Sequence, residues 1–272
     1  MNDEYNLSDG LDVSKYNSEQ LKEILQGIKD GVDVSVYAKP EFTHGQMRQI
    51  RRGLKDGLDV STYAKIEFND REMFQIRLGL EKGLDVSVYA KPEFGGYQMD
   101  EIRRGLKDGL NVAVYARPEF VSSQMRIIRL GLEKGLNVSV YANPEFDCYQ
   151  MNEIRQGLEK DLDVSVYAKP EFDDGQMKQI RFGIEDGLDV SVYAKPEFTV
   201  GHMAEIRLRL EKELDPAVGR MAEIRLKLEN LEKGLDFSSA YIKSVDHKEN
   251  HSKDLALRMD EYFNEYENDS ER

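Results

Sequence analysis

A pattern of apolar residues at helical spacing recurs along this chain. In the stretch 47–58 the apolar side chains fall at i, i+3, i+7 and i+11: Met47, Ile50, Leu54 and Leu58. This spacing places them on one side of an α-helix of about three turns, roughly 18 Å long. Gly57 suits the left-handed conformation that ends many helices. The stretch is therefore predicted to form an amphipathic helix.

A second phrase, Asp-Val-Ser-Val-Tyr-Ala with small changes, follows each predicted helix and has two interpretations. Asp59 can cap a short helix in which Val60 and Tyr63 share one side. In most units a Lys-Pro pair then ends this helix, because the residue before proline avoids the α region. Alternatively, apolar and polar residues alternate as in a β-strand, which would give a unit like a leucine-rich repeat. Thr62 replaces one alternating valine, which favours the short helix.

Both phrases recur with a constant step of 26 residues. The tyrosine of the second phrase stands at Tyr37, Tyr63, Tyr89, Tyr115, Tyr141, Tyr167 and Tyr193. The methionine of the first stands at Met47, Met73, Met99, Met125, Met151, Met177 and Met203. The fold prediction is an all-α protein, an α-solenoid of 26-residue helix-turn-short-helix repeats with atypical terminal caps.

The two ends of the chain depart from the regular repeat. The first unit lacks about five linker residues, and a Met-Ala-Glu-Ile-Arg-Leu phrase returns after only 18 residues near the other end. Four parts are predicted: an N-terminal capping unit at 1–30, the regular array at 31–214, degenerate repeats at 215–242 and an acidic C-terminal helix or tail at 243–272.

Two recurrent residues call for a physical reason. Gly53 and its equivalents lie inside the predicted helix, where glycine costs about 1 kcal/mol relative to alanine, so we expect close backbone contact with a neighbouring unit.

The second recurrent residue is an arginine, found at Arg51, Arg77, Arg103, Arg129, Arg155, Arg181 and Arg207. The first unit has Leu25 there and also lacks the linker glutamate that later units have, as at Glu41. This joint absence predicts ion pairs between each linker and the helix that follows.

The composition limits the classes of function. With 38 Lys and Arg against 52 Asp and Glu, the net charge of -14 argues against a protein whose whole surface binds nucleic acid. Long apolar runs and a basic secretory leader are not found, so we expect a soluble, cytoplasmic protein. One cysteine, Cys148, excludes an intrachain disulfide. Common catalytic motifs are lacking, and we expect no enzyme activity, no catalytic or metal residues and no cofactor.

Candidate binding residues lie where near-identical units differ. The tripeptides after each linker phenylalanine vary, and so does one column on the helices, where exposed apolar side chains would mark a partner surface. The predicted partner-binding residues are His44, Arg52, Arg71, Leu78, Tyr97, Arg104, Leu130, Tyr149, Gln156 and Phe182. A protein partner is favoured and no membrane contact is expected. The alternative is a nucleic-acid-binding solenoid that uses the arginine column, and the oligomeric state stays open.

The unit resembles a known type of repeat. Its Tyr-Ala-x-Pro-x-Phe, Gln-Met-x-x-Ile-Arg-x-Gly-Leu and Gly-Leu-Asp-Val-Ser phrases are similar to short helical repeats in uncharacterised proteins of Firmicutes, including polyvalent proteins of phages and conjugative elements. The resemblance covers about residues 10–242, with Ile66 replacing one linker proline. It brings no catalytic residues. It implies a mobile-element protein that acts as an inhibitor or adaptor on a host defence protein.

Overall fold

The computed structural model describes residues 12–214, and within this range every regular element is helical, with no β-strand. The α-helices are α1 (Ser18–Asp30), α2 (His44–Lys55), α3 (Asp70–Glu81), α4 (Gly96–Lys107), α5 (Ser122–Glu133), α6 (Cys148–Leu158), α7 (Asp174–Glu185) and α8 (Val200–Leu214). The 3₁₀ helices are η1 (Val13–Lys15), η2 (Val34–Val36), η3 (Val60–Thr62), η4 (Val86–Val88), η5 (Val112–Val114), η6 (Val138–Val140), η7 (Val164–Val166) and η8 (Val190–Val192). The all-α repeat prediction is confirmed, whereas the parts predicted at 215–242 and 243–272 lie outside the described residues.

The Asp-Val-Ser-Val-Tyr phrase forms a turn of 3₁₀ helix, and the β-strand alternative is wrong for the described units. In η3 the Asp59 carboxylate accepts a hydrogen bond from the Ser61 backbone N–H (3.1 Å), and the Tyr63 N–H donates to the Val60 carbonyl (3.0 Å). The aspartate thereby satisfies an N–H group that the start of a helix leaves without a partner. Local hydrogen bonding therefore sets the turn.

The long helices begin three residues before the repeated methionine. α2 starts at His44 because a capping box fixes its first turn. The Gln46 side-chain oxygen accepts from the Thr43 backbone N–H (2.7 Å), and the Thr43 hydroxyl accepts from the Gln46 N–H (3.2 Å). Gly57 follows the helix with a φ of 69°, as predicted. The helix predicted over 47–58 is thus shifted toward the N-terminus.

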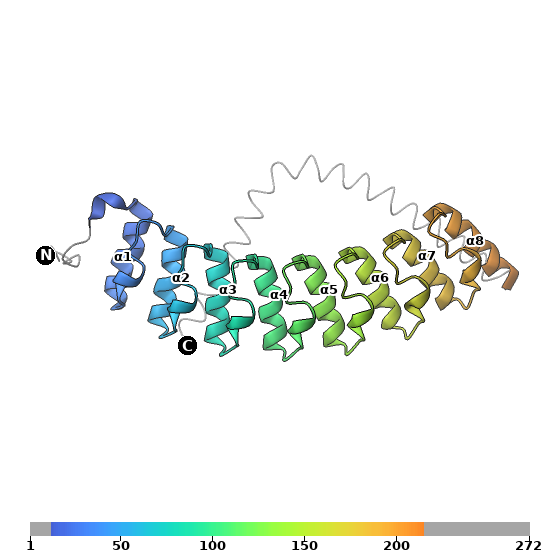
Figure 1. The fold of residues 1–272 in the computed structure, drawn as a ribbon, viewed down its shortest axis with the longest axis horizontal. Helices are drawn as coiled ribbons and strands as arrows, with labels where there is room; N and C mark the ends of the chain where they lie inside the picture. The colour runs from blue at the N-terminus through green and yellow to red at the C-terminus, as the bar shows by residue number, and fades with distance from the viewer. Residues whose placement is uncertain (1–11, 215–272) are drawn as a thin grey trace. The chain divides into compact units, whose positions relative to one another are not determined.

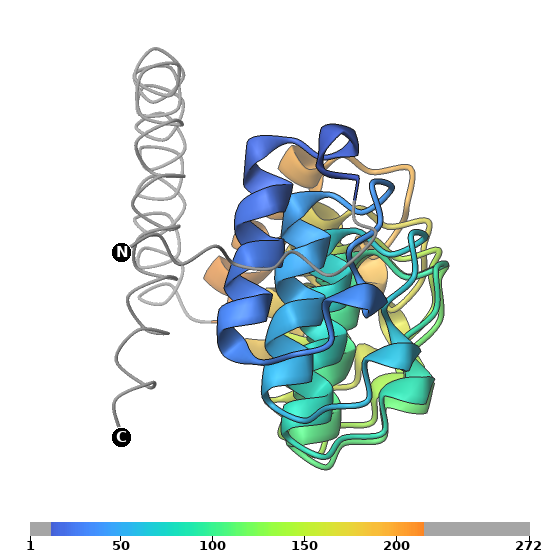
Figure 2. The same ribbon diagram turned by 90° about the vertical axis from the view of Figure 1, so that its left-hand side faces the viewer.

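The chain divides into two compact units, which are described separately. Among the described residues the first unit comprises 12–185 and 190–200, and in it α1 to α7 stand side by side in chain order (Figure 1). Figure 2 shows that the α-helices form one layer of this unit, while the 3₁₀ turns and linkers form the other. The repeated tyrosines are fully buried in it. In the second unit, which includes 186–189 and 201–214, Arg207 pairs with Asp186 (3.8 Å) and with Glu211.

A glutamine near the start of most α-helices joins one unit to the next. In α4, Gln98 Nε2 donates to the carbonyls of Pro118 (3.2 Å) and Phe120 (2.7 Å) in the following linker. The same bond to a linker phenylalanine carbonyl is made by Gln20, Gln46, Gln124, Gln150 and Gln176. We call this contact the glutamine clasp. In α3 the position is Glu72, which caps Asn69 (2.8 Å) but has no N–H group to donate, so the clasp is interrupted there.

The glycine inside each helix makes room for a tyrosine hydroxyl. Tyr89 crosses over Gly79 and donates to the backbone carbonyl of Gln75 (3.1 Å). A Cβ atom at Gly79 would lie 2.0 Å from Tyr89 Oη and 2.7 Å from Val86 Cγ1. The expected close contact exists, but it is made by a tyrosine side chain of the same unit and not by the backbone of a neighbouring unit. Every helix from α1 to α7 repeats it.

Substitution Gly79→Ala should lower the free energy of unfolding by about 2 kcal/mol. The added methyl must displace a buried ring, which outweighs the gain in helix propensity of about 1 kcal/mol. Urea denaturation measures the change. Adding Tyr89→Phe should recover part of the loss, because the hydroxyl is the nearest atom. Gly201→Ala, where nothing lies within 4 Å, is the control and should cost little.

The buried tyrosines should make the fold sensitive to alkali. Desolvation between the layers raises the pKa of six of them above the ordinary value of 10, namely Tyr37, Tyr63, Tyr89, Tyr115, Tyr141 and Tyr167. Because the folded pKa is raised, this stability is complete below pH 10 and is lost as the pH rises above it. Circular dichroism and tyrosinate absorbance should change together. Tyrosinate absorbance reaching its full value at unchanged helicity would contradict the prediction.

Candidate interaction surface

The two sets of variable residues predicted from the sequence share one side of the helical layer. On α3, Arg71 and Leu78 are seven residues apart. Seven residues are about two helical turns, so both side chains leave the helix on the same side. The same spacing relates two further predicted pairs: Tyr97 with Arg104, and Tyr149 with Gln156. Met73 and Ile76 point the opposite way and are fully buried. We call the side defined by the second and ninth residues of α2 to α7 the outer face.

Two exposed tyrosines, Tyr97 and Tyr149, lie on the outer face near the helix starts, and we call them the aromatic row. Tyr97 is 64% exposed and Tyr149 is 69% exposed. The Arg71 guanidinium on α3 lies 4.2 Å from the centroid of the Tyr97 ring on α4, so the two side chains stack across adjacent helices. Of the other predicted residues, His44 and Arg104 are exposed, while Arg52, Leu78, Leu130, Gln156 and Phe182 are half-buried. Apart from His44, the first residue of α2, all the predicted residues are the second or ninth residue of their helix and therefore lie on the outer face.

Two exposed apolar side chains near the helix starts were missed by the sequence reasoning. Ile66 is 67% exposed and Val121 is 58% exposed. Ile66 occupies the place of a linker proline. Val121 precedes α5 at the N-cap, where its side chain makes no capping hydrogen bond. The signal available in the sequence was an apolar residue at a position that suits proline or a polar cap.

The repeated arginines are buried or half-buried and paired, but the predicted pairing with the linker glutamates is wrong. Arg129 Nε donates to Glu101 on the preceding helix (2.8 Å), and its guanidinium also pairs with Glu133 one turn further along α5. Burial alone would lower the pKa of Arg129, but the hydrogen bond and charge of Glu101 outweigh it and raise the pKa. The linker glutamates are exposed at Glu41, Glu67, Glu93, Glu119, Glu145, Glu171 and Glu197. The ladder therefore joins helix to helix and not linker to helix.

One step of this arginine ladder is incomplete. The residue of α5 that corresponds to Glu101 is Ile127, which cannot accept a hydrogen bond from the next helix. Arg155 Nε on α6 is accordingly buried without a hydrogen-bond partner, although its terminal nitrogens pair with Glu159 and with Asn152 (2.8 Å). A buried donor left without a partner costs about 1–3 kcal/mol.

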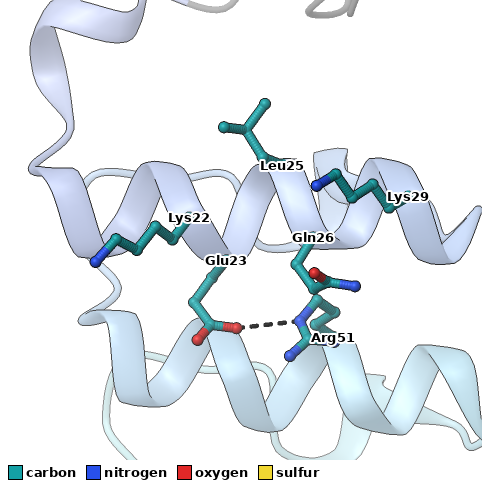
Figure 3. A pocket seen from close by; sticks show the side chains of 6 residues that line it. All are labelled: Lys22, Glu23, Leu25, Gln26, Lys29 and Arg51. Atoms are coloured by element: carbon teal, nitrogen blue, oxygen red, sulfur yellow. Dashed lines mark hydrogen bonds and ion pairs between the residues drawn. The ribbon is translucent and has the colours of Figure 1, made fainter.

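A shallow cavity of about 370 Å³ lies over α1 and α2, lined by Lys22, Glu23, Leu25, Gln26, Lys29 and Arg51 (Figure 3). The Glu23 carboxylate points from α1 toward Arg51 on α2 and pairs with it at 3.0 Å. Leu25 points away from α2 and stands where later helices carry an arginine. The cavity thus combines a structural ion pair with lysines at its rim.

Metal and membrane features are lacking in the described range. Residues 12–214 contain no group of three or more histidine, cysteine, aspartate or glutamate side chains placed to bind a metal ion. Cys148, the first residue of α6, is a free thiol. Within the same range, none of the helices has the length and apolar character that crossing a bilayer requires.

Comparison with protein-family models, with curated proteins and with solved structures found no match for this chain. The resemblance to repeats of mobile elements therefore stays a prediction. The surface described above has to be interpreted from its own residues.

Substitution Ile127→Glu should raise the free energy of unfolding by about 1 kcal/mol, because the new carboxylate gives Arg155 Nε the partner that Glu101 gives Arg129. Thermal unfolding measures the change. The reciprocal variant Glu101→Ile should destabilise the protein by leaving Arg129 Nε without its partner. Equal melting temperatures for wild type and both variants would show that these pairs contribute nothing to stability.

Proposed function

We propose that this protein is a non-enzymatic scaffold that binds another protein through the outer face of α2 to α7. The supporting observation is the difference between the two sides of the helical layer. The buried methionines, isoleucines and tyrosines are nearly the same in every unit, whereas the side chains that vary from unit to unit lie on the outer face. Repeat arrays commonly bind partners through such an extended surface.

The chemistry of the outer face suits a protein partner. Tyrosine, phenylalanine and arginine are enriched in protein interfaces and dominate their binding energy. Tyr97, Tyr149 and Phe182 supply aromatic rings, Arg71 stacks on the Tyr97 ring, and Arg104 adds a second guanidinium group on the same face. Helices packed about 8–10 Å apart place these groups along several neighbouring helices, which gives room for an interface of ordinary size, about 800 Å² per partner.

The resemblance to repeats of phages and conjugative elements extends the proposal. Proteins of such elements meet the defence systems of their host. A host defence protein is therefore the proposed target, with this chain as its inhibitor or adaptor.

The alternative, a nucleic-acid-binding solenoid, gains little support from the arginine column. Binding along a nucleic acid requires cations that are free to neutralise phosphates. Arg77, Arg129 and Arg181 are 4%, 7% and 3% exposed, and each pairs with a glutamate of its own helix. These arginines are already neutralised inside the fold.

The double substitution Tyr97→Ser with Tyr149→Ser should weaken partner binding at least tenfold, since hot-spot residues contribute about 2 kcal/mol or more. The test is affinity capture from nuclease-treated lysate of the native host, followed by mass spectrometry and quantitation of the captured protein. Val192→Ser is the matched control, because Val192 is also an exposed apolar side chain (45%) but lies in η8.

The control should capture as much partner as the wild type. Equal capture by all three proteins would exclude the aromatic row as the binding surface. Capture that disappears with nuclease would instead favour the nucleic-acid alternative.

A further inference from the structure

α2 is unlike the other described helices in its charge. Its sequence, HGQMRQIRRGLK, contains Arg48, Arg51, Arg52 and Lys55 but no acidic residue. Each of the other α-helices from α1 to α8 contains at least one aspartate or glutamate. The buried positions are nearly uniform along the array. The outer face therefore differs locally at α2, which has basic but no acidic side chains.

The closest comparison is α4, which ends with the same RRGLK sequence. There Asp100 pairs with Arg103 (2.7 Å) and Arg104 (2.9 Å), so one carboxylate serves both arginines. On α2 the place of Asp100 is taken by Arg48. Arg52, the equivalent of Arg104, consequently makes no hydrogen bond or ion pair within residues 12–214.

The carboxylates of α1 neutralise only part of this charge. Glu23 pairs with Arg48 (2.8 Å) and with Arg51 (3.0 Å). Asp30 pairs with Arg51 (2.5 Å) and with Lys55 (3.4 Å). Both acids are thus shared between cations, and none is left for Arg52. Burial, followed by the charges of neighbouring arginines, lowers the pKa of Arg52, and the charge of Glu23 opposes this shift only in part.

Side chains of the two neighbouring helices, α1 and α3, extend the surface around Arg52. Lys22, which also pairs with Glu19 (2.8 Å), and Lys29 line the rim of the cavity on the α1 side (Figure 3). On the α3 side, Leu78 occupies the same ninth position as Arg52 and is half-buried. A ligand that covers this surface therefore meets a cluster of cations with an apolar side chain beside it.

We propose that the outer surface of α2, formed by Arg48, Arg52 and Lys55 with Lys22 and Lys29 beside it, binds an acidic segment of the partner protein. Guanidinium groups bind carboxylates through paired, charge-assisted hydrogen bonds, and Arg52 has its donors available for them. The inference rests on the proposed function in one respect, that the outer face is the binding face. It adds the chemistry of the partner and the helix that recognises it.

A protein carboxylate fits this surface better than a nucleic acid. The unneutralised charge is confined to one helix, about 10 Å wide, and α3 follows with Asp70, Glu72 and Glu81. A phosphate backbone would need cations on several successive helices. The net charge of -14 repels a long polyanion, whereas a short acidic segment makes contact only at the cation cluster.

The test uses the full chain and a synthetic helical peptide with glutamates on one side and leucines on the other. Binding is followed by fluorescence anisotropy of the labelled peptide. We expect saturable binding that weakens as salt rises, because the screening length falls from about 10 Å at 0.1 M to about 3 Å at 1 M. The same peptide with glutamine in place of glutamate should bind at least tenfold more weakly.

Two variants locate the site. Arg52→Gln should weaken binding of the glutamate peptide about tenfold, whereas Lys107→Gln, which removes an exposed cation from α4, should leave it unchanged. Asp100→Arg should create a second site on α4, since it reproduces the arrangement of Arg48 on α2. Melting temperatures and circular dichroism establish that each variant is folded.

Several results would overturn the inference. Equal binding by the Arg52→Gln and Lys107→Gln variants would remove α2 as the site, and so would equal binding of the two peptides. Arg52-dependent binding of a single-stranded oligonucleotide in place of the peptide would assign the surface to phosphates. A doubled mass in light scattering that Arg52→Gln abolishes would assign it to a second copy.

Binding of the peptide that strengthens when Asp260 and Glu261 are changed to their amides would assign the surface to the chain's own acidic segment. Failure of the peptide alone leaves the proposed function testable by the Tyr97 and Tyr149 variant, so the two proposals fail independently.

Discussion

The fold depends on the contact between a buried tyrosine hydroxyl and a glycine inside a helix. Because the glycine has no side chain, the tyrosine ring lies directly against the helix, and its hydroxyl bonds to a carbonyl of that helix, as Tyr89 does at Gln75. This contact fixes the distance between the two layers in every unit from α1 to α7. With that distance fixed, the linker reaches the next helix at the same place each time. Regular spacing of the helices follows from one local constraint.

Structure and recognition are separated on the two sides of the same helix. One side carries Met73 and Ile76, which are fully buried, and the other carries Arg71 and Leu78, which face outward. Variation on the outward side leaves the packing between layers untouched. The arginine ladder lies between these sides, because its arginines are at least half-buried and most of them bond to the preceding helix, as Arg129 does to Glu101. A binding surface can therefore change one side chain at a time while the array keeps its shape.

The sequence predicted the fold well because its signals repeat. A constant period, the apolar spacing around Met47 and the capping aspartate at Asp59 each report a local hydrogen bond or a buried side. The partners of the arginines were not predictable in the same way, since Glu101 lies 28 residues before Arg129 and only the packing of adjacent helices brings them together. The incomplete rung at Arg155 and the unpaired Arg52 depend on the same packing. The binding residues were identified by variation, which indicates where recognition can occur and not what is recognised.

The interruption of the glutamine clasp at Glu72 gives the array an uneven mechanical strength. Each unit touches only its neighbours, so the row behaves as a one-dimensional series of links, and its resistance to stretching is set by the weakest one. Gln46 and Gln98 each hold the next linker by a side-chain hydrogen bond, while Glu72 has no N–H to offer. Under tension the described array would part first between α3 and α4. The shorter piece would then carry α1 to α3, including the basic surface of α2.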